Sequence, residues 1–149
     1  MSNFFETLKS QTQAEREYLL AAPIIARVFK GQVSTTEYAS FLAQAYHHVK
    51  HTVPLMMAVG AKLSTEQEWI REAVAQYIEE EIGHQEWVLN DIAACGFDKQ
   101  QVRQSAPKFA TELMVAYAYD TINRGNPLAF FGMVHVLEGT SIALADGAA

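Results

Sequence analysis

The segment from Glu66 to Ala94 has the pattern of one long helix with a buried face. Apolar or large side chains recur in it at intervals of three, four or seven residues, the spacing typical of such a helix. They are Ile70, Val74, Tyr77, Val88 and Ile92. The same stripe passes through Glu81 and His84. A carboxylate and an imidazole are therefore expected where apolar side chains would normally lie.

Glu81 and His84 are three residues apart, so on a continuous helix they share a face and can reach one point. Burying a carboxylate is costly unless something pairs with it, and a bound cation would offset that cost. Glu-x-x-His on an inward helix face is one way in which helical bundles hold iron or manganese. The alternatives are a buried ion pair without metal, or a face that meets solvent.

The whole chain reads as helices, and no convincing strand pattern appears in its 149 residues. The pattern predicts five helical segments that form one all-α bundle over residues 1–149. The first covers residues 3–30 with a weak point at Pro23, and the second begins at a capping box at 34–37 and bends at Pro54. The third covers residues 66–94. The fourth begins at Asp98 and is interrupted at Pro107, and the fifth runs from 126–127 to near the end.

Helical spacing also predicts which faces of the second and fourth segments are buried. The expected inner residues are Phe41, Leu42, Ala45, Val49, Met56 and Met57 in the second segment, and Phe109, Leu113, Ala116 and Tyr117 in the fourth.

The fifth segment carries a second carboxylate–imidazole pair. Residues 128–138 are apolar apart from His135 and Glu138, so this helix is expected to lie in the interior. His135 and Glu138 are again three apart, and a self-satisfied His–Glu pair is the competing interpretation. Two helices that are predicted to be buried thus carry the same pair of groups, which suits a first-row metal better than calcium. Phe131, Met56 and Tyr77 are expected to form a dry pocket.

The second segment contains His47, His48 and His51. His47 and His51 have helical metal-ligand spacing, but the cation of Lys50 between them would oppose a metal. We therefore interpret this region as a polar face. Tyr46 and His48 remain candidates to line a pocket.

Charge and composition exclude several classes of protein. The formal net charge is −6, and no polybasic run is present, so a nucleic-acid partner or a charged membrane surface is not expected. The single cysteine, Cys95, suits a reducing cytoplasm. The N-terminus does not have the pattern of a signal peptide, and the apolar run 128–145 is interrupted by His135 and Glu138. A cytoplasmic protein without a membrane span is expected.

Three stretches resemble the iron-containing redox enzymes of the haem-oxygenase-like fold. They are Glu80–Trp87, Leu89–Ile92 with Gly96, and Val136–Ser141. The resemblance extends in helix order over nearly the whole chain. The relatives include the haem-oxygenase-like di-iron oxidases and oxygenases, and more distantly the TenA-like thiaminases and pyrroloquinoline-quinone synthase.

The resemblance implies iron ligands at Glu81, His84 and Glu138, whereas His135 is a candidate from spacing alone. It implies a non-haem iron oxidoreductase, with one or two ions and manganese as a possible substitute, that uses dioxygen on a small organic substrate. No histidine precedes His47 and Cys95 lies at a helix end, which disfavours haem ligation and thiaminase chemistry. The alternative is a metal-free TenA-like binding or dimerisation protein.

Members of this family usually continue through a further helix with an aspartate and histidines. The chain ends at Ala149, so it is expected to match the N-terminal two-thirds of a member, truncated or degenerate. A chain of this kind should bind at most one iron weakly, expose apolar surface along residues 130–144 and form a homodimer. The sequence leaves the catalytic residues unassigned.

Overall fold

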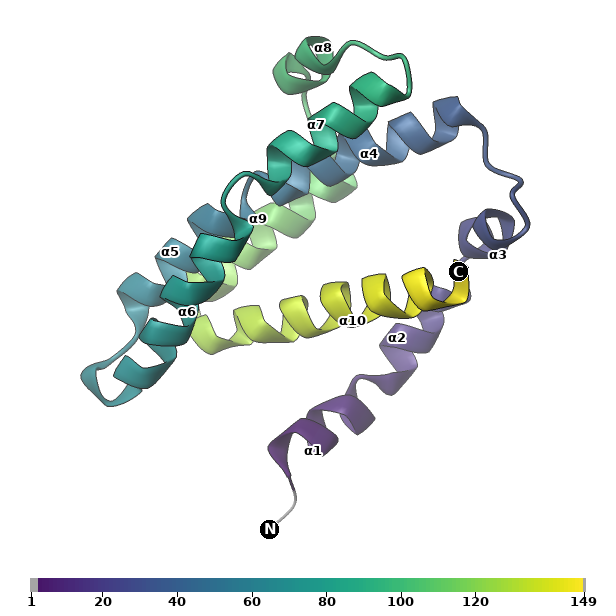
Figure 1. The fold of residues 1–149 in the computed structure, drawn as a ribbon. Coiled ribbons are helices and arrows are strands. Elements are labelled where there is room, and N and C mark those ends of the chain that lie inside the picture. Colours follow the sequence, from purple (N-terminus) through teal and green to yellow (C-terminus); the bar gives the residue numbers. More distant parts are fainter. Residues whose placement is uncertain (1–2, 149) are drawn as a thin grey trace. The chain divides into compact units, whose positions relative to one another are not determined.

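The protein is helical throughout the part that the computed structural model describes, which is the backbone of residues 3–148 and the side chains of residues 3–141 and of Leu144 (Figure 1). The all-α prediction is therefore confirmed. Two compact units are present: residues 34–130 form one, and residues 1–33 with residues 131–149 form the other.

The unit of residues 34–130 is a bundle in which α4 packs against α7 and α9, and α5 packs against α6 and α9 (Figure 1). Its elements, in chain order, are α4 (Thr35–Val49), α5 (Thr52–Lys62), η1 (Thr65–Gln67), α6 (Glu68–Glu81), α7 (His84–Ala94), α8 (Lys99–Gln104), α9 (Phe109–Arg124) and η2 (Pro127–Ala129).

Local signals place the start and the break of the second predicted segment. The Ser34 hydroxyl accepts from the backbone N–H of Glu37 at 3.2 Å, and the Glu37 carboxylate accepts from the backbone N–H of Ser34 at 2.9 Å. Pro54 has no N–H, and its ring would crowd the carbonyl of Lys50 in a continuous helix. The helix accordingly stops at Val49 and restarts at Thr52, so the predicted bend is a break between α4 and α5.

The core of this unit lies on faces that spacing predicted only in part. Leu42 and Tyr46 of α4 cluster with Leu89 and Ile92 of α7. The other fully or nearly fully buried apolar side chains include Leu55, Met56 and Val59 of α5, Val74 of α6, and Val115, Ala118 and Ile122 of α9. Leu42 and Met56 are therefore buried as expected.

The predicted inner face of α9 is wrong. Phe109, Leu113 and Tyr117 are 81%, 55% and 71% exposed, and Ala116 is also exposed. Helix α9 carries apolar residues on two faces, and the one that packs against α4 and α5 contains Val115, Ala118 and Ile122. In the second predicted segment, Phe41 and Met57 are likewise 64% and 56% exposed.

The long helix predicted over residues 66–94 is broken at Ile82 and Gly83. Ile82 is extended, with φ −61° and ψ 120°, and Gly83 is left-handed, with φ 99° and ψ −9°. These are the angles of a type II turn, in which the third residue needs a positive φ and is usually glycine. Helix α6 therefore ends at Glu81 and α7 begins at His84.

Replacing Gly83 by alanine is expected to lower the free energy of unfolding by about 1 kcal/mol, because a Cβ disfavours this positive φ. A Cβ at Gly83 would meet no atom of the described residues within 4 Å, so the variant tests backbone strain alone. Gly60→Ala is the matched control: Gly60 lies within α5, and its new Cβ would make an ordinary 3.7 Å contact with Val74. That variant should be neutral or more stable. Equal urea midpoints for both variants would contradict the turn assignment.

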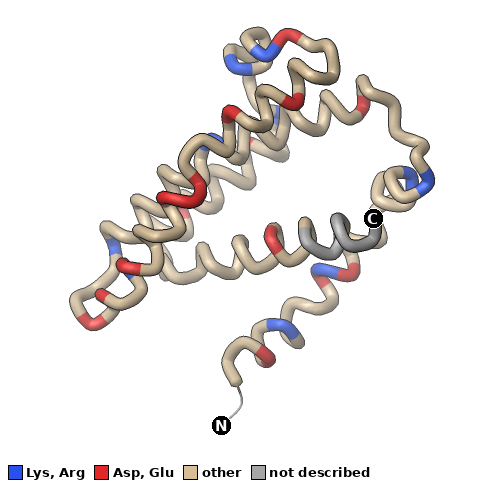
Figure 2. The backbone as a smooth tube through the Cα atoms, in the orientation of Figure 1, with Lys and Arg blue, Asp and Glu red and all other residues tan. Residues whose placement is uncertain are grey.

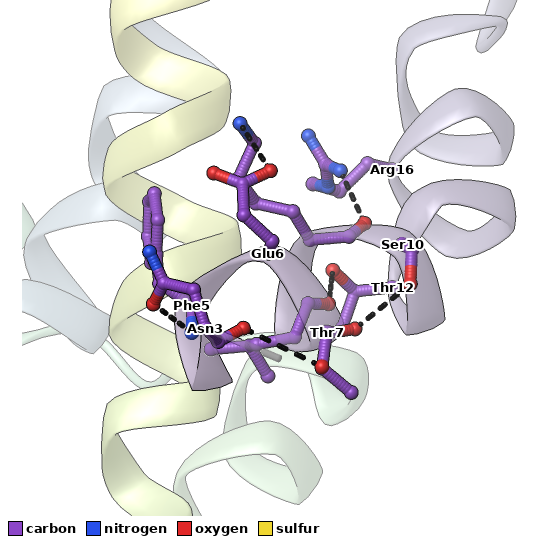
Figure 3. Close-up of polar contacts among 9 residues, drawn as sticks. Asn3, Phe5, Glu6, Thr7, Ser10, Thr12 and Arg16 are labelled. Atoms are coloured by element: carbon purple, nitrogen blue, oxygen red, sulfur yellow. Dashed lines mark hydrogen bonds and ion pairs between the residues drawn. The ribbon is translucent and has the colours of Figure 1, made fainter. Parts of the chain in front are cut away.

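The other unit contains α1 (Phe4–Gln11), α2 (Gln13–Leu20), α3 (Pro23–Phe29) and, beyond its first residue, α10 (Phe130–Ala148). The segment predicted as one helix with a weak point at Pro23 is interrupted at Thr12 as well. At this junction the Thr12 hydroxyl donates to the carbonyl of Leu8 at 2.8 Å, and Arg16 donates to the carbonyl of Lys9 at 2.8 Å (Figure 3). Arg16 thus ties α2 back to the end of α1.

Helix α10 follows the predicted Asn126–Pro127 start after one 3-10 turn, in which Asn126 accepts from the backbone N–H of Leu128 at 3.0 Å. Its predicted interior position is only partly correct. Phe130 and Thr140 are buried, but the side chains of residues 131–137 are half-buried and Glu138 is exposed.

Candidate metal centre

The turn at residues 82–83 brings Glu81 and His84 together. Glu81 is the last residue of α6 and His84 is the first residue of α7. The imidazole Nδ1 lies 3.0 Å from the carboxylate Oε2, and the two side chains are 29% and 14% exposed. The two groups meet as the spacing predicted, but through a type II turn instead of a continuous helix face.

The separation of these two atoms fits a metal ion. Two neighbouring ligands of an octahedral ion, each about 2.1 Å from it, are about 3.0 Å apart. The Nδ1–Oε2 distance therefore suits either an N–H···O hydrogen bond or two adjacent ligand atoms, with the ion replacing the proton between them. A carboxylate with an imidazole is a donor set that suits first-row transition metals.

Glu86, two residues beyond His84, is engaged elsewhere. Both oxygens of its carboxylate accept from Arg103 of α8, at 2.7 Å each. The hydrogen bond with Arg103 lowers the pKa of Glu86. Since this bidentate pair occupies the carboxylate, Glu86 fastens α8 to α7 and is not a candidate ligand.

The surroundings of the pair are acidic and aromatic. Glu79 and Glu80 precede Glu81 at the C-terminal end of α6, where Figure 2 shows a continuous acidic stretch. The helix dipole at this end favours a nearby cation. The ring of Trp87 lies over the imidazole of His84, with 4.2 Å between the ring centroids.

His135 and Glu138 belong to α10, in the other unit. The Nε2 atom of His135 is buried and has no hydrogen-bond partner among the described residues, while Phe5 contacts the ring edge-on at 5.7 Å. An unpaired buried nitrogen is uncommon and calls for an ion or a water. Within the described part of the chain, no group of three or more His, Cys, Asp or Glu side chains is gathered as metal ligands would be.

His47 is a buried connector that the sequence interpretation missed. It is 1% exposed, so the predicted polar face is wrong at this position. Its Nε2 lies 2.9 Å from the Ser105 hydroxyl, which donates to the carbonyl of Val102, and its Nδ1 lies 3.3 Å from the Lys50 ammonium. Because Lys50 can only donate, His47 accepts at Nδ1 and donates from Nε2 to Ser105. No signal near His47 in the sequence points to Ser105.

Acid is expected to destabilise the protein through His47. Burial lowers its pKa from the ordinary 6.5, and the charges of Lys50 and His51 lower it further, against the opposing effect of Glu112. The unfolded chain therefore takes up this proton more readily, and stability is lost as the pH falls below about 6.5. Urea midpoints at about pH 7.5 and pH 5.5 should differ less for His47→Gln than for the wild type. An equal loss in both would refute the assignment.

Met56, which was expected to form a dry pocket with Phe131 and Tyr77, lines an open cavity of about 380 Å³ between α5 and α6. Phe131 and Tyr77 are not among the residues that line this cavity. Most of the other lining residues are small or aliphatic, among them Gly60, Ala75 and Ile78. Ile78 lies one helical turn before Glu81, so the cavity reaches to within a turn of the candidate metal pair. No helix in the described part of the chain is long and apolar enough to cross a membrane.

Comparison with solved structures defines the class of protein as all-α with a haem oxygenase-like fold. The chain is similar to the crystal structure of a domain of unknown function with this fold from Shewanella denitrificans OS217, with a TM-score of 0.84 and 26% sequence identity. The similarity covers 99% of this chain and 66% of that one. A comparison with curated proteins finds no match.

The family model for iron-containing redox enzymes matches residues 39–149. The chain belongs to this family. The matched range includes Glu81, His84, His135 and Glu138.

Proposed function

We propose that the protein is a non-haem iron oxidoreductase in which Glu81 and His84 hold iron. The observation that supports this most directly is the 3.0 Å approach of Nδ1 and Oε2 across the turn between α6 and α7, in a chain of the iron-containing redox family. Bound ferrous iron would supply one-electron chemistry with dioxygen. One or two ions are compatible with the proposal, and manganese is an alternative metal.

Several features of the chain favour a metal ion beside Glu81 and His84. The half-buried Glu81 carboxylate supplies negative charge at the C-terminal end of α6, where the dipole also favours a cation. The left-handed Gly83 fixes the turn that sets the distance between the two side chains. Arg103 engages both oxygens of the Glu86 carboxylate, so this group would not be available to a metal ion. Around this turn, the proposal thus assigns Glu81 and His84 as ligands and Gly83 and Arg103 as supporting residues.

Glu138 and His135 remain predicted ligands. The family resemblance supports Glu138. His135 is supported by its buried Nε2, which has no hydrogen-bond partner among the described residues. We further propose that dioxygen and a small organic molecule are the substrates. The aliphatic lining of the cavity between α5 and α6, which reaches to within a turn of Glu81, favours a molecule with an apolar body.

Anaerobic loading with ferrous iron, followed by desalting and addition of air-saturated buffer, tests the proposal. The wild type should retain iron and consume dioxygen faster than the same amount of free ferrous iron. A chain that retains no iron, or consumes dioxygen no faster than free iron does, would instead support a metal-free helical binding protein.

A further inference from the structure

Trp87 is a large aromatic residue next to the proposed ligand His84. It lies on α7, three residues after His84, and is 63% exposed. Its ring centroid is 4.2 Å from that of the imidazole, and the two ring planes are inclined by 38°. Side chains three residues apart on a helix are neighbours, so α7 holds Trp87 beside the imidazole.

Two side chains contact different parts of the His84 imidazole. The Glu81 carboxylate engages the edge of the imidazole at Nδ1, and the Trp87 ring covers its face. Rotation about the Cβ–Cγ bond of His84 would break the first contact and disturb the second. The orientation of the imidazole therefore depends on Glu81 and on Trp87.

We propose that Trp87 is a positioning residue that keeps Nδ1 of His84 directed at the Glu81 carboxylate. This inference rests on the proposed role of His84 as an iron ligand. Removal of a hydrogen-bonding partner that orients a ligating histidine typically costs 10–100-fold in metal affinity, and we expect an effect at the lower end of this range for a stacked ring. The flat face of the ring, and not its bulk, provides the restraint.

The test compares Trp87→Ala, Trp87→Phe and Trp87→Leu in the full chain, with ferrous iron titrated under anaerobic conditions. Alanine and leucine should weaken iron binding by about tenfold or more, whereas phenylalanine should stay within about threefold of the wild type. Trp69→Ala is the matched control, because Trp69 is 73% exposed on α6 and its loss should leave the affinity unchanged. If Trp87→Leu binds iron as tightly as Trp87→Phe does, the stacking role is wrong.

A second measurement uses the metal-free protein. The ring ¹⁵N shifts of His84 report which nitrogen carries the proton, and the hydrogen bond to Glu81 sets this tautomer. The Nδ1–H form should dominate in the wild type and in Trp87→Phe, and lose ground in Trp87→Ala, with unchanged melting temperatures because Trp87 is exposed. Unchanged shifts in Trp87→Ala would refute the positioning role.

The two proposals fail in different ways. If Trp87→Ala binds iron like the wild type while His84→Ala does not, Trp87 has no positioning role and the proposed function stands. If His84→Ala itself binds iron like the wild type, the proposed function is wrong.

Discussion

Replacing Glu81 or His84 by alanine is expected to weaken the binding of ferrous iron by at least about 100-fold. Each residue would supply one of the two atoms that lie 3.0 Å apart, so either change removes one of the two proposed ligands that the turn brings together. Loss of a direct ligand should cost more than the 10–100-fold typical of residues that only support one. Anaerobic titration against a chelator of known affinity measures the change.

Glu80→Ala is the matched control for this pair. Glu80 is the exposed neighbour of Glu81, and its replacement removes the same charge from the same end of α6. A general electrostatic contribution of the acidic stretch would weaken iron binding in Glu80→Ala and Glu81→Ala alike, and would be screened by salt. A specific site predicts a large loss for Glu81→Ala and His84→Ala only. Similar affinities in all three variants would contradict the ligand assignment.

Ile122→Ala is expected to lower the free energy of unfolding by about 2–5 kcal/mol, the range for removing a buried aliphatic side chain. Ile122 is 1% exposed on the face of α9 that packs against α4 and α5. Leu113→Ala removes the same number of carbon atoms from the same helix, but Leu113 is 55% exposed. Its cost should stay below about 1 kcal/mol.

Urea unfolding of both variants decides which face of α9 is buried. A larger loss for Leu113→Ala than for Ile122→Ala would show that the face predicted from spacing, with Phe109 and Tyr117, is the packed one after all. Equal losses would mean that both faces are covered.

Signals that act over a few residues predicted the local structure well. The capping box at Ser34, the effect of Pro54 and the start at Asn126 all depend on neighbouring backbone groups, which the sequence specifies directly. Gly83 was harder to interpret. A glycine is tolerated within a helix at a modest cost, so the apolar stripe on both sides of it favoured a continuous helix over two helices joined by a turn.

Features that depend on distant parts of the chain could not be predicted. Helix α9 is apolar on two faces, and only the positions of α4 and α5 decide which of them is buried. The buried His47 forms its hydrogen bond with Ser105, which is 58 residues away. The Glu86 carboxylate pairs with Arg103, which is 17 residues away. The approach of His84 to Glu81 could be predicted, because the two residues are only three apart in sequence.

X-ray absorption at the iron edge, on protein loaded with one ferrous ion per chain, tests the central claim most directly. Iron held by Glu81 and His84 should show a first shell of nitrogen and oxygen without sulfur, with the outer-shell scattering of an imidazole ring. In His84→Ala loaded under the same conditions, the imidazole scattering should be weaker, or the bound iron itself should be lost. Retention of the same iron content and the same imidazole scattering in His84→Ala would show that His84 is not an iron ligand.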